Sequence, residues 1–425
     1  MPQTKGLHAV ALVCGSLLFG TALSVVMAEF YYRHMLRSFA RTPGCFWVTD
    51  PVTGFANAPN GQCHTVTAEF DTWMSYNSDG NPSPEFNPDP RACTVMALGD
   101  SHTSAVGVSS GEAWPNLLES RLKSGFQQPF QVVNTGVAGY SVGQEYSKME
   151  EYIGKFKPRH VVLGLSLATD FYDIRPPGQN GFVYGSDLMR PYYDVENGVL
   201  VLKPAPPIPS KGGTADPSAP RGHTSFIRSI KPYFEGHSAL YHAIYRGAIG
   251  QYGVRLMRKF GVNPWPNADS TLARNLDPVD RHSWLVVEKL LEQFQDVLGR
   301  QDVGFTLVII PYLPQVYDAV WNRTFASDAR YDRFAADKRL DRICRRYGID
   351  CLDLTEPFIG AARSSGKWLH YRQDAHPTRE GQALIGQLVA EHLSERLLRE
   401  CALAPSKSPA SSAQPPKLPF KGKTV

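Results

Sequence analysis

Short, uninterrupted apolar runs alternate with amphipathic segments along most of the chain after residue 93. The apolar runs predict buried parallel strands, because such strands are covered on both faces. These runs are residues 94–98, 130–133, 160–165, 305–310 and 351–354. Segments in which apolar residues recur every three or four positions predict helices. These segments are residues 112–123, 144–156, 330–347 and 381–398.

Strands that alternate with helices along a chain pair in parallel through right-handed crossovers. We therefore predict a three-layer α/β/α domain over residues 42–401. The alternation stops between about residues 172 and 278, which predicts a central insertion. Within it, residues 191–202 carry the turn signal Glu196-Asn197-Gly198 of a hairpin, and residues 224–260 have a helical, aromatic pattern. Such an insertion is either a lid or substrate wall, or a structural cap or docking surface.

Two further segments lack periodicity. Residues 42–90 are rich in Pro, Gly, Asn and Asp, which predicts an irregular preface to the domain. Residues 402–425 contain several prolines among Ser and Lys, which predicts a disordered tail.

The N-terminus carries an uncharged apolar run of 22 residues, from Leu7 to Ala28. A bilayer-spanning helix needs about 20 such residues, so this run predicts a membrane span. The rival interpretation is a cleaved signal peptide, with Lys5 as its charged start and Val26-Met27-Ala28 as a cleavage site. Because signal peptides have apolar regions of about 7–15 residues, the length favours an uncleaved anchor. We predict that residues 1–41 form the membrane anchor and juxtamembrane segment.

Charge and cysteine content give opposite predictions for the orientation of this anchor. Arg33, Arg37 and Arg41 follow the run, and the positive-inside rule would place the domain in the cytoplasm. Six cysteines lie outside the run, and an even number suits an oxidising compartment. They are Cys45, Cys63, Cys93, Cys344, Cys351 and Cys401.

Cysteine pairing is suggested by the order of the predicted elements. Cys344 and Cys351 straddle a helix end and a strand start, and Cys45 and Cys63 bracket one loop. A Cys93–Cys401 bridge is a third possibility, because the last helix should pack beside the first strand. The alternative is six reduced, buried thiols. We predict an extracytoplasmic domain, periplasmic or extracellular.

The composition of the chain argues against several classes of function. Apolar residues make up 42% of the chain and charged residues 20%, which is typical of a globular protein. The net charge of +4 equals the four lysines of the tail, so the body is neutral and lacks the basic surface of a nucleic-acid-binding protein. The histidines form no ligand-spaced clusters, and no GxGxxG loop follows a strand, so we predict no metal site and no cofactor.

Three short motifs place chemically useful residues beside strand-like segments. Gly99-Asp100-Ser101 follows the first strand, a loop containing Gly139 follows the second, and Asp374-Ala375-His376-Pro377 precedes the last helix. Acyl transfer needs a nucleophile, a base, an acid that orients the base, and oxyanion donors. Each motif alone has an ordinary explanation, such as a capping serine or a turn glycine. Together they favour Ser101 as nucleophile, His376 as base and Asp374 as its orienter, with His370 as a rival base.

The blocks GDSH (99–102), NTGVAGYSVGQ (134–144) and DAHPTREG (374–381) resemble the nucleophile, oxyanion-glycine and Asp/His blocks of SGNH (GDSL-like) hydrolases. The resemblance spans residues 90–400 and implies a flavodoxin-like sheet. It implies the same roles for Ser101, His376 and Asp374, and an oxyanion hole with N–H donors from Ser101 and Gly139. The family normally has an Asn after the third strand, where this chain has Thr169, which implies a hydroxyl as third donor.

These residues predict a membrane-anchored serine esterase or deacylase that acts on O-acyl groups of a carbohydrate or cell-envelope substrate. One alternative is an O-acyltransferase on a polysaccharide, in which a sugar hydroxyl captures the same acyl-serine. The other is a catalytically weakened domain that binds glycan or assembles an envelope complex. The presence of Thr169 in place of the family's Asn motivates the alternative of a weakened domain, because loss of one oxyanion donor costs roughly 100- to 1000-fold in turnover.

Overall fold

The computed structural model describes residues 15–17, 19–31, 47–67, 69–177, 190–205, 268–372 and 374–402. Residues 15–17 and 19–31, which overlap the predicted membrane span, are helical. Within the described ranges, no helix is both long enough and apolar enough to cross a bilayer. The remainder of that span, the predicted helical stretch 224–260 and the tail after residue 402 lie outside the described residues.

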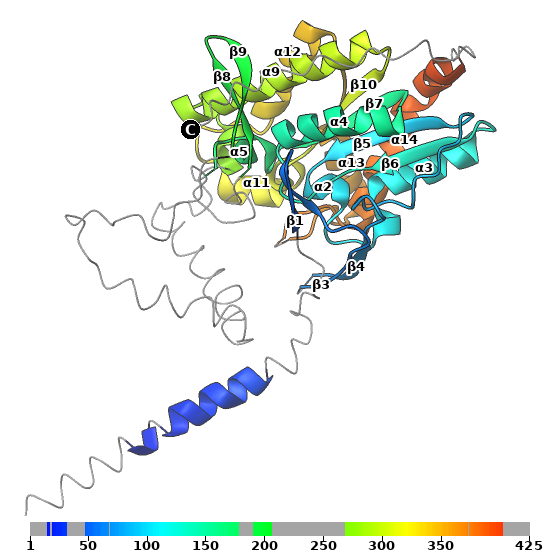
Figure 1. The fold of residues 1–425 in the computed structure, drawn as a ribbon. Helices are drawn as coiled ribbons and strands as arrows, with labels where there is room; N and C mark the ends of the chain where they lie inside the picture. The colour runs from blue at the N-terminus through cyan, green and yellow to red at the C-terminus, as the bar shows by residue number, and fades with distance from the viewer. Residues whose placement is uncertain are drawn as a thin grey trace, which may run out of the picture.

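A five-stranded parallel sheet forms the centre of the domain (Figure 1). Its strands are β5 (Cys93–Gly99), β6 (Phe130–Asn134), β7 (His160–Ser166), β10 (Gly304–Ile310) and β11 (Asp350–Asp353). They lie in the order β11-β10-β7-β5-β6, and each neighbouring pair is parallel. Counted along the chain this order is 2-1-3-4-5, the flavodoxin-like arrangement. The predicted strands and their flavodoxin-like sheet are confirmed.

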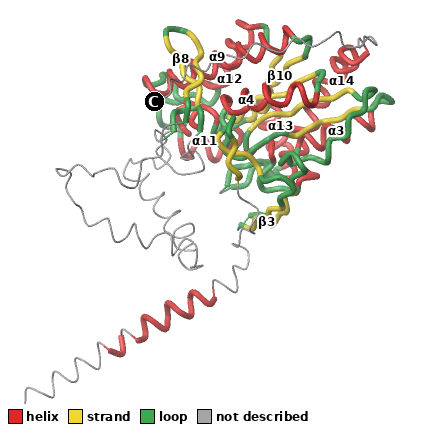
Figure 2. The backbone as a smooth tube through the Cα atoms, viewed as in Figure 1, coloured by secondary structure: helices red, strands yellow, loops and turns green. Residues whose placement is uncertain are grey.

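Helices cover both faces of this sheet (Figures 1 and 2). Side chains of a strand point alternately to opposite faces. Met96 and Leu98 accordingly join one hydrophobic core, and Val95 and Ala97 join another. The first core is closed by α4 (Val142–Phe156), α9 (Pro278–Arg300) and α12 (Ala335–Tyr347), the second by α3 (Trp114–Gly125), α13 (Thr355–Ser365) and α14 (Arg379–Ala402). The predicted three-layer α/β/α architecture is confirmed.

Short helices connect these elements, mostly near the carboxyl ends of the strands. They are α2 (Ser101–Ser104), η2 (Ser110–Glu112), α5 (Asp170–Asp173), η4 (Ala268–Leu272), α10 (Leu313–Val316) and α11 (Asp318–Thr324). The helix predicted over residues 330–347 begins only at Ala335. The preceding residues form a turn in which Asp332 Oδ1 accepts a hydrogen bond from Phe334 N, 3.0 Å away.

The prediction of an irregular preface over residues 42–90 is wrong for residues 47–75, whereas residues 76–90 form neither helix nor strand. Two antiparallel hairpins form within residues 47–75: β1 (Trp47–Asp50) with β2 (Gly54–Asn57), and β3 (Gln62–Val66) with β4 (Asp71–Ser75). Their strands have only four or five residues, which is too short for a clear alternation of polar and apolar positions.

The hairpin predicted over residues 191–202 is confirmed as β8 (Tyr192–Glu196) and β9 (Val199–Lys203). Asn197 and Gly198 have φ angles of 52° and 80°, as a type I′ turn requires.

Disulfides join distant and neighbouring parts of the domain. Cys93 at the start of β5 is bonded to Cys401 near the end of α14, and Cys344 in α12 is bonded to Cys351 in β11. Both were anticipated from the order of the elements. Cys63 is also disulfide-bonded, and its predicted partner, Cys45, lies outside the described residues.

Candidate active site

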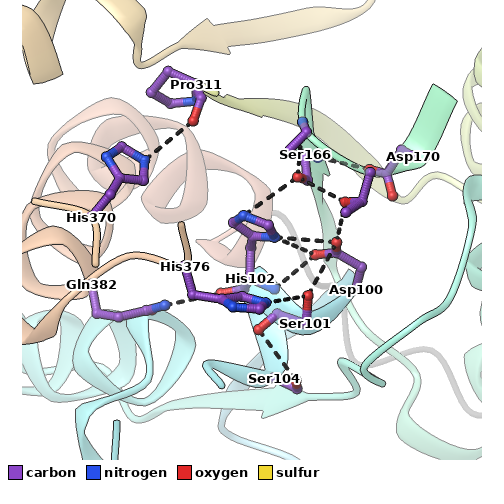
Figure 3. Close-up of polar contacts among 12 residues, drawn as sticks. Asp100, Ser101, His102, Ser104, Ser166, Asp170, Pro311, His370, His376 and Gln382 are labelled. Carbon is purple, nitrogen blue, oxygen red and sulfur yellow. Dashed lines mark hydrogen bonds and ion pairs between the residues drawn. The ribbon is translucent and has the colours of Figure 1, made fainter. Parts of the chain in front are cut away.

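The structure brings the three predicted catalytic residues together. Ser101 opens α2 directly after β5, and Asp374 and His376 lie in the loop before α14. The Ser101 Oγ atom is 2.8 Å from His376 Nε2. The other ring nitrogen, Nδ1, is hydrogen-bonded to the Asp374 carboxylate. Figure 3 shows the His376 ring directed at Ser101.

The turn that presents Ser101 depends on the glycine that precedes it by two residues. Gly99 has a φ of 151°, and a Cβ atom there would lie 2.1 Å from Thr103 Oγ1 and 2.8 Å from the Gly164 carbonyl oxygen. No larger residue fits this position. Asp100 then caps α2, because its Oδ1 accepts a hydrogen bond from His102 N at 2.7 Å. Ser101 is therefore fixed at the carboxyl edge of the sheet.

The His376–Asp374 pair has the electrostatics of a general base and its orienter. Burial lowers the pKa of His376, but the hydrogen bond and charge of Asp374, with the charge of Asp100, outweigh burial and raise that pKa. Burial would raise the pKa of Asp374, but its contact with His376 outweighs this and lowers it. At neutral pH Asp374 is thus ionised and His376 is a strengthened base, as removal of the serine proton requires.

A second, buried network lies behind the nucleophile and centres on Asp100, which is 1% exposed. Its Oδ2 accepts a hydrogen bond of 2.6 Å from Thr169 Oγ1, and both carboxylate oxygens lie 3.2 Å from His102 Nδ1. Burial raises the pKa of Asp100, but His102 and Thr169 outweigh burial and lower it. Sequence reasoning did not include Asp100 among the site residues, although its place beside the nucleophile was the available signal.

The resemblance implied that the Thr169 hydroxyl is a donor to the oxyanion. In the structure this hydroxyl already donates a hydrogen bond to another group. It donates either to Asp100 Oδ2 or to Ser166 Oγ, which is 2.9 Å away. A hydroxyl has one proton, so donation to an oxyanion would cost the charge-assisted bond to Asp100.

The other two implied oxyanion donors are backbone groups. Gly139 has a φ of 83°, which favours glycine at this place in the loop after β6. Within the described residues, neither the Ser101 N–H nor the Gly139 N–H donates a hydrogen bond to the backbone or to a side chain. Both are therefore available to a developing negative charge.

His370, the rival base, is not at the nucleophile. It is fully buried, and its Nε2 lies 3.3 Å from the Pro311 carbonyl oxygen (Figure 3). Burial, with a smaller effect of the nearby His102, lowers its pKa to about 3. It is a neutral structural residue.

The β1–β2 hairpin braces the loop that carries Gly139. Asn57 Nδ2 donates to the Gly136 carbonyl oxygen at 3.2 Å, and the Tyr140 hydroxyl donates to the Phe55 carbonyl oxygen at 2.7 Å. Gln144 Nε2 donates to the Thr53 carbonyl oxygen at 2.9 Å. The β1–β2 hairpin thus helps to hold the loop that carries Gly139 in position.

Two carboxyl groups lie buried in the same region of the domain as Asp100. Neither oxygen of Glu145 has a hydrogen-bond partner among the described residues, and Asp170 accepts one hydrogen bond, from Ser166 N at 2.7 Å. Burial raises both pKa values well above the usual carboxyl range. The charge of Asp100 adds to this effect at Glu145, and the charges of Glu145 and Asp100 add to it at Asp170. Both carboxyl groups therefore hold their protons to a higher pH than an exposed carboxyl group does, whereas Asp100 ionises at a lower pH. In the described ranges no three His, Cys, Asp or Glu residues are placed to hold a metal ion.

Comparison with known proteins gives only distant similarities. No family model matches the chain, and no curated protein matches it. Among solved structures, the psychrotrophic esterase EstA from Pseudoalteromonas sp. is 12% identical, with 72% of this chain and 98% of that chain covered and a TM-score of 0.34. The acetyl xylan esterase AlAXEase is 13% identical, with 70% and 98% covered and a TM-score of 0.36. A two-domain esterase active on acetylated mannans, CEX, is 11% identical, with 75% and 52% covered and a TM-score of 0.35. Similarities at this level establish no family, and we take the function from the geometry of the site.

Proposed function

We propose that this chain is a serine esterase of the SGNH type that removes O-acyl groups from a carbohydrate or cell-envelope substrate. The observation that carries the proposal is the contact of 2.8 Å between Ser101 Oγ and His376 Nε2, with Asp374 bonded to the opposite ring nitrogen. This is the geometry in which a serine proton passes to an imidazole that a carboxylate orients.

The proposed reaction has two steps. His376 Nε2 takes the Ser101 proton while Oγ forms a bond to the acyl carbon, and the Ser101 and Gly139 N–H groups stabilise the oxyanion. The bond between the acyl carbon and the sugar oxygen then breaks as His376 gives its proton to that oxygen, so the sugar leaves as an alcohol and the acyl group stays on Ser101. In the second step His376 takes a proton from water, the water oxygen attacks the acyl carbon, and the acid leaves as Ser101 regains its proton.

The proposal includes a membrane anchor and an extracytoplasmic domain. The uncharged run from Leu7 to Ala28 supports the anchor, since its length matches the thickness of a bilayer. The bridges Cys93–Cys401 and Cys344–Cys351 support an oxidising compartment, because structural disulfides are rare in the cytoplasm. A protease-protection assay on intact cells or spheroplasts tests this part separately from the chemistry.

A catalytically weakened glycan-binding domain is the second candidate. The hydrogen bond from Thr169 to Asp100 favours it, because it leaves the oxyanion hole with only two backbone donors. An O-acyltransferase uses the same residues as the esterase and differs in which hydroxyl enters the second step.

Purified full-length chain should hydrolyse p-nitrophenyl acetate and a panel of O-acetylated oligosaccharides. Ser101→Ala should abolish this activity, whereas Ser120→Ala, on the exposed face of α3, should leave it unchanged. Acylated sugar that accumulates when a free acceptor is added would identify a transferase. If the wild-type chain turns over no ester but binds the oligosaccharides in calorimetry, it is a binding domain and the esterase proposal fails.

A further inference from the structure

The loop that carries Asp374 and His376 is held from outside by a carboxylate of the preface. Glu69 Oε1 accepts a hydrogen bond of 2.7 Å from Arg372 N, and Glu69 Oε2 accepts one of 3.0 Å from Asp374 N. One side chain therefore binds two backbone N–H groups of this loop, one of them on Asp374, the residue that orients His376.

Other hydrogen bonds join residues of this loop to one another. They fix the shape of the loop but not its position relative to Ser101. Tyr371 N donates to the His376 carbonyl oxygen at 2.8 Å, and Ala375 N donates to the Tyr371 carbonyl oxygen at 3.0 Å. Ala375 has a φ of 70°, a strained value for a residue with a side chain. These bonds close the loop on itself, so its position relative to Ser101 depends on contacts with other parts of the chain.

Glu69 is well placed to supply such a contact because hydrogen bonds fix its backbone and that of its neighbour Phe70. It lies between β3 and β4, where Thr67 Oγ1 accepts hydrogen bonds from Glu69 N and Phe70 N, both at 3.1 Å. The Phe70 ring packs on Tyr371, with ring centroids 4.9 Å apart. The Tyr371 hydroxyl in turn donates to the Gly107 carbonyl oxygen at 2.7 Å, a few residues after the nucleophile.

We propose that Glu69 is a positioning residue that holds the Asp374–His376 loop in register with Ser101. The inference rests on the proposed function, because it assigns Glu69 a role in the reactivity of that triad. A carboxylate makes stronger hydrogen bonds than a neutral acceptor, and two bonds to alternate residues restrain both the position and the tilt of the loop. A small shift of the base relative to the nucleophile can cost about 100-fold in rate.

Two substitutions of Glu69 and one matched control test this role. Glu69→Ala removes both acceptors, and Glu69→Gln keeps the side-chain shape with one acceptor. Glu85→Gln is the control, because Glu85 accepts hydrogen bonds from Ser78 N at 2.9 Å and Ser78 Oγ at 2.7 Å in the same preface, away from the catalytic loop. We expect kcat for p-nitrophenyl acetate to fall about 10- to 100-fold in Glu69→Ala, less in Glu69→Gln, and to stay near wild type in Glu85→Gln. KM should change little in all three variants.

The pKa of His376 provides a readout that does not need turnover. Asp374 raises it against burial, so a displaced loop should lower it. Histidine NMR titration of the folded full-length chain, with the signal assigned by His376→Gln, should show a lower His376 pKa in Glu69→Ala than in wild type or Glu85→Gln.

These measurements separate failure of this inference from failure of the proposed function. An active wild type with an unchanged kcat and an unchanged His376 pKa in both Glu69 variants would overturn the inference alone. The same holds if Glu85→Gln loses as much activity as Glu69→Ala. An inactive wild type would overturn the esterase proposal, and the NMR titration would still decide whether Glu69 positions the loop.

Discussion

Thr169→Val separates two roles that the Thr169 hydroxyl could have. Valine has a methyl group where threonine has its hydroxyl, so the substitution removes one O–H donor with little change in side-chain volume. In the structure this hydroxyl donates to Asp100 Oδ2 at 2.6 Å, and Asp100 is a buried, ionised carboxylate. Thr169 makes no side-chain cap for α5, so no helix cap is lost.

The expected effect of Thr169→Val is on stability. A hydrogen bond to a charged group contributes about 1.5–3 kcal/mol, and the free energy of unfolding at pH 7 should fall by about that amount. The hydroxyl also helps to lower the pKa of Asp100. A lowered folded-state pKa stabilises the fold above the unfolded pKa and loses this effect as the pH falls through the folded value. The difference between wild type and Thr169→Val should therefore shrink in acid.

Urea unfolding from neutral to acid pH, with kcat measured on the same samples, checks this expectation. Thr169→Ser keeps the hydroxyl and should restore most of the stability. The fall in kcat for Thr169→Val should be smaller than the roughly 100- to 1000-fold loss that follows removal of an oxyanion donor. Unchanged stability together with a loss of that size would refute the reasoning and make Thr169 an oxyanion donor.

Three other substitutions test the electrostatics and the covalent framework. Asp374→Asn should lower the pKa of His376, because Asp374 raises it in the wild type. The acid limb of the pH–rate profile should then move to lower pH while the rate on the plateau falls, and an acid limb that does not move would contradict the pairing of Asp374 with His376. The pKa of Glu145 is raised in the folded state, so its contribution to stability is present below the usual carboxyl pKa and is lost as the pH rises through the folded-state value. Glu145→Gln should therefore flatten this part of the pH dependence of the free energy of unfolding in urea, and an unaltered pH dependence would contradict a raised pKa of Glu145. Replacing Cys93 and Cys401 by serine should cost about 2–4 kcal/mol in the free energy of unfolding under oxidising conditions, and equal stability of the two proteins would show that the bridge does not form.

The sequence contained enough to predict the sheet and the triad, because both depend on local patterns. Fully buried strands such as β5 and β7 read as apolar runs. Ser101 and the Gly139 loop follow β5 and β6, and Asp374 and His376 directly precede the last helix, α14. The helix α9 was missed, although Asp277 and Pro278 are a recognisable helix start, because it adjoins the predicted insertion.

Contacts between distant polar side chains could not be predicted in the same way. The bond from Glu69 to Asp374 joins residues 305 positions apart, and the bond from Thr169 to Asp100 joins residues 69 apart. Neither leaves a periodic signal, since each depends on one side chain in a turn. The short β1–β2 and β3–β4 hairpins were missed because strands of four or five residues are too short to show a clear alternation. The β1–β2 hairpin also packs on Val137 and Tyr140 of a distant loop, which no local pattern predicts.

Labelling with a fluorophosphonate tests most directly whether Ser101 is a nucleophile activated by His376. The reagent reacts much faster with an activated serine than with an ordinary hydroxyl, and mass spectrometry of the digested protein locates the adduct. We predict one adduct, on Ser101, with loss of labelling in Ser101→Ala and strongly slowed labelling in His376→Gln. A folded wild-type chain that stays unlabelled, or one that is labelled on another serine, would contradict the account.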